Sequence, residues 1–463
     1  MSEPAAPPAS GQPLDIDDIV DHQSFGWSSI LFICLGVLIL VSDGFDLAAI
    51  GYIAPALAKE WQVDPAQLVP VFSAGIIGLM IGGPSLGMLG DRYGRRRLII
   101  AGLSVIGLAS LASIAATTPF ELAVLRFITG LGLGGVVPNV IALVAEVTPK
   151  RIRGRLIITV ALGMVLGSAL CGLVTASVMP RFGWRGVLVI GGILPLIMAI
   201  ATRYGAPESL KFLLTRPRRS DEALSTMRRM RPDLNINPGF TIATNGAEVG
   251  SSSMPIRQVF TGPFRYVTPL LWICLASNQM ANYFSLTWLP TLLQSSGLSP
   301  VDASVAASFF PLGGLIGGLL LLAVIDRLGV IPMAILFLLG APFIATMVLP
   351  GLPLWGYHVL IAGAGLCSMG VQLAVTALLG ILYPTTVRST GTGLAQAAGR
   401  IGALAAPVVG GALLAMNASP DRMTLAPAAL FLVGAVSSTA LAIICYRKLG
   451  TWRVDELSLE NSR

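Results

Sequence analysis

Two carboxylates, Asp43 and Asp46, lie in a part of the chain where charged side chains are rare. The apolar stretch around them runs from about residue 27 to residue 57, and a helix needs roughly 20 apolar residues to cross a bilayer core. Ionised side chains inside a membrane are costly and usually line a pathway for a substrate or an ion. A soluble helix with an acidic edge is the alternative. We interpret both carboxylates as membrane-embedded groups that bind and release protons.

Two arginines in other apolar stretches are the matching cations. Arg126 begins the segment RFITGLGLGGVVPN, and we expect it at the depth of Asp46, where the two would form a buried ion pair. A snorkelling arginine near the outer interface is the alternative. Arg400 lies near the middle of the apolar segment 390–415, where a cation needs a partner or an anionic ligand. An internal ion pair with Asp43 or Asp46 is the alternative to a ligand.

Polar side chains in three apolar segments are candidates for the wall of a substrate cavity. The segment ASNQMANYFSLTWLP carries several of them, and Gln396 lies one helical turn before Arg400 on the same face. Hydrogen bonds between helices are the alternative role for such groups. Together with the aromatic ring between the two acids, the candidates for substrate binding are Phe45, Asn278, Asn282, Tyr283, Gln372 and Gln396.

The composition indicates an integral membrane protein. The chain of 463 residues is 54% hydrophobic and 11% charged, with a mean hydropathy of +0.79, whereas soluble domains carry roughly 25% charged residues. The net charge of +7 comes from short basic clusters between apolar runs, a pattern typical of membrane topology and not of nucleic-acid binding. All five cysteines lie in apolar stretches. We therefore expect no disulfide framework, no metal site and no cofactor.

Polar breaks divide the apolar sequence into twelve segments. We predict an all-α membrane protein with twelve transmembrane helices in two pseudo-symmetric halves of six. Basic residues concentrate on the side of the N-terminus, so both termini are predicted to be cytoplasmic. The predicted segments are 28–57, 67–89, 98–116, 120–144, 155–178, 185–204, 267–293, 302–325, 330–349, 355–381, 390–415 and 425–446.

The predicted domain organisation has five parts. Residues 1–27 form a cytoplasmic arm without the basic start of a cleaved signal peptide, and we expect this arm to be disordered. Residues 28–204 and 266–446 form the two six-helix bundles. Residues 205–265 form a cytoplasmic loop in which SDEALSTMRRM is a candidate surface helix, and residues 447–463 form a cytoplasmic tail.

Charged motifs recur at the cytoplasmic ends of both halves. The Asp-Arg pair in GMLGDRYGRRR reappears in LLLLAVIDRLGV, at the same offset that separates two Pro-x-x-x-Arg motifs further along. Several coincidences at one offset indicate a duplicated six-helix unit. We assign gating contacts to the charged residues of these motifs and to a nearby glutamate, namely Asp91, Arg92, Arg95, Glu146, Arg153, Asp326 and Arg388.

These motifs resemble those of a known family. GMLGDRYGRRR is similar to the loop between helices two and three of the major facilitator superfamily, and RFITGLGLGGVVPN to its fourth helix. The combination of DGFD, PESLKFLL and GILYPTTVRSTGTGLAQAAGRIG further resembles the aromatic acid:proton symporters over nearly the whole chain. Members often carry a histidine in the loop between helices eight and nine. This chain has none between residues 326 and 331, so no role for it carries over.

The resemblance implies a secondary transporter of the bacterial inner membrane. It would import a hydroxybenzoate, benzoate or aryl-alkanoate with protons by alternating access, with Arg400 or Arg126 binding the carboxylate. The expected partners are this substrate, protons and the lipid bilayer, and we expect a monomer.

Other functions receive less support from the sequence. A transporter of sugar acids or dicarboxylates is one alternative. A drug:proton efflux antiporter is disfavoured because the fifth predicted segment, ALGMVLGSALCGLVTA, lacks the Gly-Pro element usual in that family. A membrane enzyme or sensor would need a nucleophile–base constellation, a metal cluster or a signalling domain, and the sequence has no such pattern.

Overall fold

The computed structural model describes most of the chain and is almost entirely helical. It covers residues 14–23, 26–214, 216, 220–230, 242–243, 259–260, 264–328, 330–383 and 388–449. Apolar stretches long enough to cross a bilayer satisfy their backbone groups internally only as helices or closed barrels. The long apolar elements of this protein are helices.

The first half of the chain contains five long helices. These are α2 (Trp27–Trp61), α3 (Val69–Tyr93), α4 (Arg95–Ala112), α5 (Pro119–Val147) and α6 (Lys150–Gly205). Helix α6 is two helices joined at Gly183, where the backbone has a φ of 65°. It therefore supplies two membrane crossings. Two short 3-10 helices, Pro65–Leu68 and Ser113–Ala115, lie beside the longer ones.

The second half contains six further long helices. These are α9 (Phe264–Ser295), α10 (Pro300–Leu328), α11 (Ile331–Thr346), α12 (Leu354–Leu382), α13 (Arg388–Ala415) and α15 (Leu425–Leu449). In the described residues, nine helices are long and apolar enough to cross a membrane. Dividing α6 at its kink and adding α9 and the shorter α11 gives the twelve crossings that the sequence predicted.

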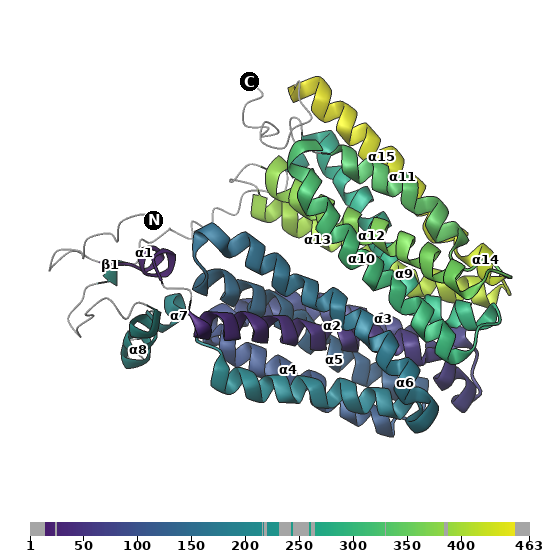
Figure 1. Cartoon of the computed structure of the whole chain (residues 1–463), viewed down its shortest axis with the longest axis horizontal. Helices are drawn as coiled ribbons and strands as arrows, with labels where there is room; N and C mark the ends of the chain where they lie inside the picture. Colours follow the sequence, from purple (N-terminus) through teal and green to yellow (C-terminus); the bar gives the residue numbers. More distant parts are fainter. Residues whose placement is uncertain are drawn as a thin grey trace.

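The two groups of helices contact each other at one end and diverge at the other. Figure 1 shows them meeting beside α14 (Pro420–Met423) and separating toward the end where α2 begins and α15 ends. We call the end beside α14 the distal end. There Gly51 of α2 packs against the carbonyl oxygen of Leu286 of α9, and the rings of Phe72 and Trp288 lie 5.3 Å apart. The distal end is therefore closed by direct contact between the halves.

Small residues allow helices within each half to approach closely. In α3 and α5, a Cβ added at Gly78 would collide with the carbonyl oxygen of Phe127, and one at Gly130 would collide with that of Gly75. Lipid gives no hydrophobic reason for helices to associate, so close van der Waals packing of this kind stabilises membrane helices. The glycines of the segment RFITGLGLGGVVPN therefore mediate tight packing of α5 against its neighbours.

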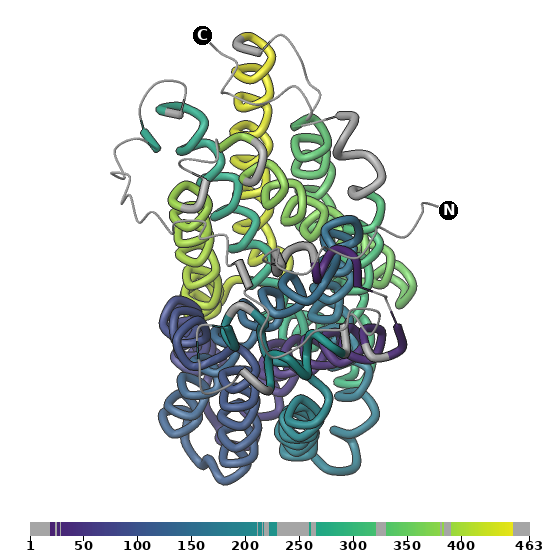
Figure 2. The backbone as a smooth tube through the Cα atoms, turned by 90° about the vertical axis from the view of Figure 1, so that its left-hand side faces the viewer, coloured from purple at the N-terminus to yellow at the C-terminus, as the bar shows by residue number. Residues whose placement is uncertain are grey.

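The N-terminal arm differs from the prediction. Residues Ile16–Asp21 form helix α1, so the expectation of a disordered arm is wrong for this part. Ile19 and Val20 are buried against apolar side chains of α7 (Leu210–Leu214) and α8 (Ser220–Met230). Helix α8 is the predicted surface helix SDEALSTMRRM. The apolar face of α8 packs against α1 and orders it. The sequence alone did not reveal this contact. Figure 1 shows α1, α7 and α8 near the N-terminal end of the long α2, and Figure 2 views the molecule from this side.

The arm is also fixed to the start of α6 by an acid. Asp21 Oδ1 accepts a hydrogen bond of 2.8 Å from the backbone N–H of Lys150, and Asp21 Oδ2 lies 3.2 Å from Lys150 Nζ. Partial burial opposes ionisation of Asp21, but these bonds and the charges of Lys150 and Arg153 outweigh it and hold the pKa of Asp21 below its ordinary value. The arm is therefore attached to the membrane-spanning part through an ionised carboxylate.

Close helix contact makes Gly44 a sensitive position. A Cβ added there would collide with the carbonyl oxygen of Met164 in α6, whereas one added at Gly154 would meet no atom within 4 Å. We expect Gly44→Ala to lower the stability of the protein by about 1–3 kcal/mol, because the helices must separate. Gly154→Ala is the matched control and should not destabilise. Thermal unfolding in detergent followed by circular dichroism measures both, and equal stability of Gly44→Ala and the parent would contradict this packing.

Candidate functional site

A buried ion pair joins α2 to α5. Arg126 Nη1 lies 3.1 Å from Asp46 Oδ2, and the two residues are 4% and 1% exposed. Ser110 of α4 donates a hydrogen bond of 2.6 Å to Asp46 Oδ1 and accepts one of 3.0 Å from Arg126 Nη2. The ion pair predicted from helix depth is confirmed, and the snorkelling alternative is wrong. No sequence pattern indicated Ser110, because its role depends on how α4 packs against α2.

Asp43 has different surroundings although it precedes Asp46 by less than one helical turn. It is 1% exposed, and neither carboxylate oxygen has a hydrogen-bond partner among the described residues. Burying an ionised carboxylate without a partner is very costly, so such a group tends to take up a proton. Asp46, in contrast, is compensated by a guanidinium and a hydroxyl. The two acids therefore differ in how easily they hold a charge.

A small cavity lies beside the ion pair, between the two halves. Its volume is about 50 Å³, and Asp46, Arg126 and Thr129 form its wall in the first half together with the ring of Phe72. Tyr283 and Thr287 of α9 line the opposite side. A cavity of roughly 150 Å³ is known to hold benzene. The observed cavity is smaller, so an aromatic ring requires the halves to move.

Arg400 reaches from the second half to the first. Its Nη1 donates a hydrogen bond of 3.0 Å to the carbonyl oxygen of Leu79, at the middle of α3. An ion pair of Arg400 with Asp43 or Asp46 is not among the contacts of the described residues. The Tyr283 hydroxyl lies within electrostatic reach of both Arg400 and Asp43. The cation, the tyrosine and the unpaired acid thus form one neighbourhood at the interface between the halves.

The other polar candidates occupy two kinds of position. Asn278 Nδ2 donates a hydrogen bond of 3.0 Å to Gln372 Oε1, and Ser368 donates one of 3.3 Å to Asn278 Oδ1. For these groups, hydrogen bonding between helices is the observed role. Asn282 is 6% exposed, and its Oδ1 has no partner in the described part of the chain. Gln396 is partly buried on the turn before Arg400.

Phe45 packs away from the small cavity. It is buried, and its ring lies close to the backbone of Gly191 in α6, where an added Cβ would be 3.6 Å from Phe45 Cε1. The cavity lining does not include it. Its observed contact is with the interior of the first half, on the side of α2 that faces α6.

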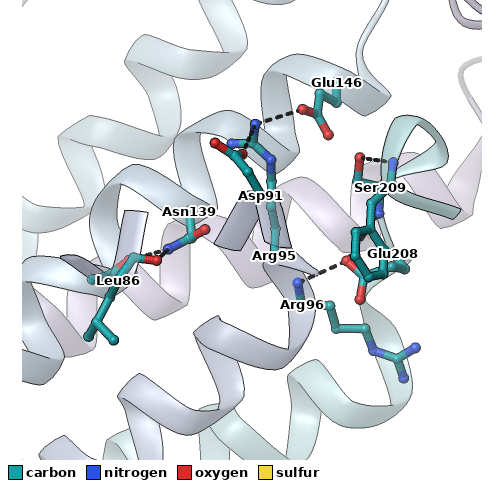
Figure 3. A network of polar contacts seen from close by, with 10 residues as sticks. Leu86, Asp91, Arg95, Arg96, Asn139, Glu146, Glu208 and Ser209 are labelled. Carbon is teal, nitrogen blue, oxygen red and sulfur yellow. Dashed lines mark hydrogen bonds and ion pairs between the residues drawn. The ribbon is translucent and has the colours of Figure 1, made fainter. Parts of the chain in front are cut away.

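A second charged network lies at the end opposite the distal end, where α3 ends and α4 begins. Figure 3 shows Arg95 between two acids, 3.1 Å from Asp91 and 2.8 Å from Glu146. These contacts join α3, α4 and α5. Between α3 and α4 the chain turns at Gly94, with a φ of 101° that favours glycine. The structure brings together these three proposed gating residues of the first half.

The remaining gating candidates are not part of this network. Arg153 donates to the carbonyl oxygen of Thr148 at 3.1 and 3.2 Å, which fixes the start of α6. The backbone carbonyl of Arg92 accepts a bond of 3.0 Å from Arg216. The side chains of Asp326 and Arg388 lie outside the described residues.

Glu208 belongs to the same region, and its role was not predicted. Its Oε1 accepts a hydrogen bond of 3.1 Å from the backbone N–H of Arg96 and one of 3.2 Å from that of Ser209, and the residue is 3% exposed. A carboxylate at this position accepts a hydrogen bond from an N–H that has no partner within α4, and its negative charge interacts favourably with the positive end of the helix dipole. The segment PESLKFLL contains this acid, but only the fold shows which helix it caps.

Comparisons with known proteins agree on one class of protein. Residues 36–407 and 271–456 match the model of the Major Facilitator Superfamily. The chain is 35% identical over 433 residues to the 4-hydroxybenzoate transporter PcaK of Pseudomonas putida, covering 92% of this chain and 96% of that protein. It is 34% identical over 413 residues to the gallate transporter of Pseudomonas putida, covering 89% and 91%.

A solved structure has a similar fold. It is a bacterial homologue of the human lysosomal transporter Spinster, in an inward-facing and occupied conformation, with a TM-score of 0.67. The match covers 92% of this chain and 98% of that chain at 14% sequence identity. At this identity the likeness extends to the fold alone.

The buried pair yields a stability prediction. Arg126→Gln leaves Asp46 charged and buried without its partner, which should cost about 3–5 kcal/mol. Adding Asp46→Asn removes the uncompensated charge, so the double variant should recover most of this loss. Unfolding in detergent measures the parent, both single variants and the double variant. Additive losses in the double variant would contradict a direct pair.

Proposed function

Because the chain belongs to the Major Facilitator Superfamily, we propose that it imports an aromatic carboxylate together with protons. The chain is a multi-pass membrane transporter and not an enzyme. The observation that carries the proposal is the buried interface between the halves, where the paired Asp46 and Arg126 line an aromatic-walled cavity. Tyr283 on the opposite wall lies within electrostatic reach of the unpaired Asp43 and of Arg400.

The substrate class rests on the chemistry of this interface and on the relatives. Proteins named for 4-hydroxybenzoate and gallate transport are similar to the chain over most of its length, and both substrates are aromatic carboxylates with ring hydroxyls. Arg400 and Arg126 supply guanidinium groups for a carboxylate. Phe72 supplies an apolar wall, and Thr129 and Tyr283 supply hydroxyls for ring substituents.

We assign the transported proton to Asp43. A carboxylate that is buried without a partner favours its neutral form, and it becomes ionised when water or a cation reaches it. Asp46 is already stabilised as an anion by Arg126 and Ser110. Its proposed role is to hold Arg126 in position, and to take part in proton movement only if that pair opens.

Proton coupling gives the import of an anion its driving force. Moving one charge across a membrane potential is worth about 2.3 kcal/mol per 100 mV, and a negative interior opposes an entering carboxylate. One proton that travels with the substrate cancels this electrical cost. The neutral Asp43 would then release its proton once the halves separate at the end opposite the distal end and water reaches the carboxyl group.

Alternating access would follow from rocking of the halves. With both termini placed in the cytoplasm of a bacterial inner membrane, the closed distal end faces outward. Opening it requires loss of the Gly51–Leu286 contact. We propose that the network of Asp91, Arg95 and Glu146 stabilises one arrangement of the first half, with Arg92 and Arg153 supporting its ends. Asp326 and Arg388 would act in the second half.

Replacing Asp43 separates coupling from binding. In proteoliposomes with an inward proton gradient, the parent should accumulate labelled 4-hydroxybenzoate and lose this ability with a protonophore. Asp43→Asn resembles the protonated acid but cannot release a proton, so it should exchange substrate across the membrane without accumulating it. Asp302→Asn, at a partly exposed acid at the start of α10 and outside the central cavity, is the control and should accumulate normally. Normal accumulation by Asp43→Asn would reject Asp43 as the proton carrier.

Arg400 can be tested for direct contact with the carboxylate. A guanidinium binds a carboxylate through two parallel hydrogen bonds, whereas an ammonium acts as a point charge. We expect Arg400→Lys to bind the acid more weakly and Arg400→Ala to lose roughly thirtyfold in affinity, corresponding to about 2 kcal/mol for a charge-assisted bond.

The amide of the same substrate provides the control. It lacks the negative charge, so it should lose little affinity on either replacement. Equal losses for the acid and the amide would instead indicate that Arg400 acts through its bond to Leu79. Unchanged acid affinity in Arg400→Ala would place the carboxylate elsewhere, with Arg126 as the next candidate.

A further inference from the structure

A second pocket lies at the distal end, apart from the central cavity. Its volume is about 330 Å³, and residues of α2, α6, α9 and α10 line it. We call it the distal pocket. Pro55, Met179, Pro300 and Val301 supply apolar walls. This volume exceeds the roughly 150 Å³ in which an apolar cavity holds benzene, so the pocket has room for a substituted aromatic ring without rearrangement.

Two polar groups in the lining fit an anion. Lys59 lies at the exposed end of α2 and lines the pocket, and it has no ion pair among the described residues. The neighbouring acid, Glu60, is engaged by Arg185 at 2.9 Å. Gln294 Nε2 is buried and donates no hydrogen bond within the described part of the chain. A free ammonium and an unused amide donor therefore border an apolar pocket.

The pocket exists only while the distal ends of the halves are together. Its lining on α2 and α6 belongs to the first half, and its lining on α9 and α10 belongs to the second. The two halves also pack closely beside the pocket: a Cβ added at Gly172 of α6 would lie 2.8 Å from the carbonyl oxygen of Ser304 in α10. A ligand bound there contacts both halves and favours the closed distal end.

We propose that the distal pocket is a second binding site for a small aromatic carboxylate, which inhibits transport when it is occupied from outside. The apolar walls take the ring, and Lys59 and Gln294 take the carboxylate. The choice of ligand rests on the proposed function, because aromatic acids are then the amphipathic anions that the protein meets. Bound ligand delays opening of the distal end, so uptake slows at high external substrate.

Equilibrium binding of labelled 4-hydroxybenzoate to the purified full-length protein tests the site. The parent should bind two equivalents, and Lys59→Gln should bind the second at least tenfold more weakly. Ala176→Phe, which fills the pocket, should remove the same equivalent. Arg400→Ala should lose the other one. Arg422→Gln, an exposed cation at the same end outside the pocket, is the matched control and should keep both.

Uptake by proteoliposomes provides the functional measurement. The initial rate of the parent should fall at high external 4-hydroxybenzoate, and Lys59→Gln and Ala176→Phe should abolish this fall while leaving uptake at low concentration unchanged. One bound equivalent in the parent, removed by Arg400→Ala, would overturn the distal site and leave the proposed function intact. Absence of all binding would overturn the proposed function. Loss of the second equivalent when phosphatidylglycerol is added would assign the pocket to a lipid.

Discussion

The ion pair between Asp46 and Arg126 is the interaction on which the interior of this protein depends. A single charge buried at that depth would oppose folding in the membrane, but the pair and the Ser110 hydroxyl compensate each other. The pair and Ser110 together connect three helices, because Asp46 lies on α2, Ser110 on α4 and Arg126 on α5. It therefore defines one wall of the cavity at the same time as it stabilises the first half.

The groups that can change their partners lie outside this fixed pair, at the boundary between the halves. Asp43 has no partner, and Arg400 uses a backbone carbonyl of the opposite half in place of an acid. Arg400 can exchange this carbonyl for another acceptor when the halves move, and Asp43 can gain a partner without losing one. The proposed transport cycle uses this difference: the paired acid keeps the architecture, and the unpaired acid responds to protons and substrate.

Tight packing confines that movement to a few positions. Within the halves, glycines bring helices into contact that a single methyl group would break, so each half behaves as one body. Between the halves, comparable contacts occur at the distal end, at Gly51 and Gly172. Motion that opens the distal end must release these contacts together. The distal pocket lies among them, and this position explains how its occupancy would affect transport.

The sequence by itself determined the twelve helices, because a run of apolar residues in a membrane must satisfy its own backbone hydrogen bonds. It also predicted the pairing of Asp46 with Arg126, since antiparallel helices place the two residues at similar depth, and the structure excluded the snorkelling alternative. Only the tertiary structure separated Asp43 from Asp46, assigned Glu208 to the start of α4 and paired α1 with α8. These features depend on the rotation and contact of helices distant in sequence, and local periodicity contains no information about either.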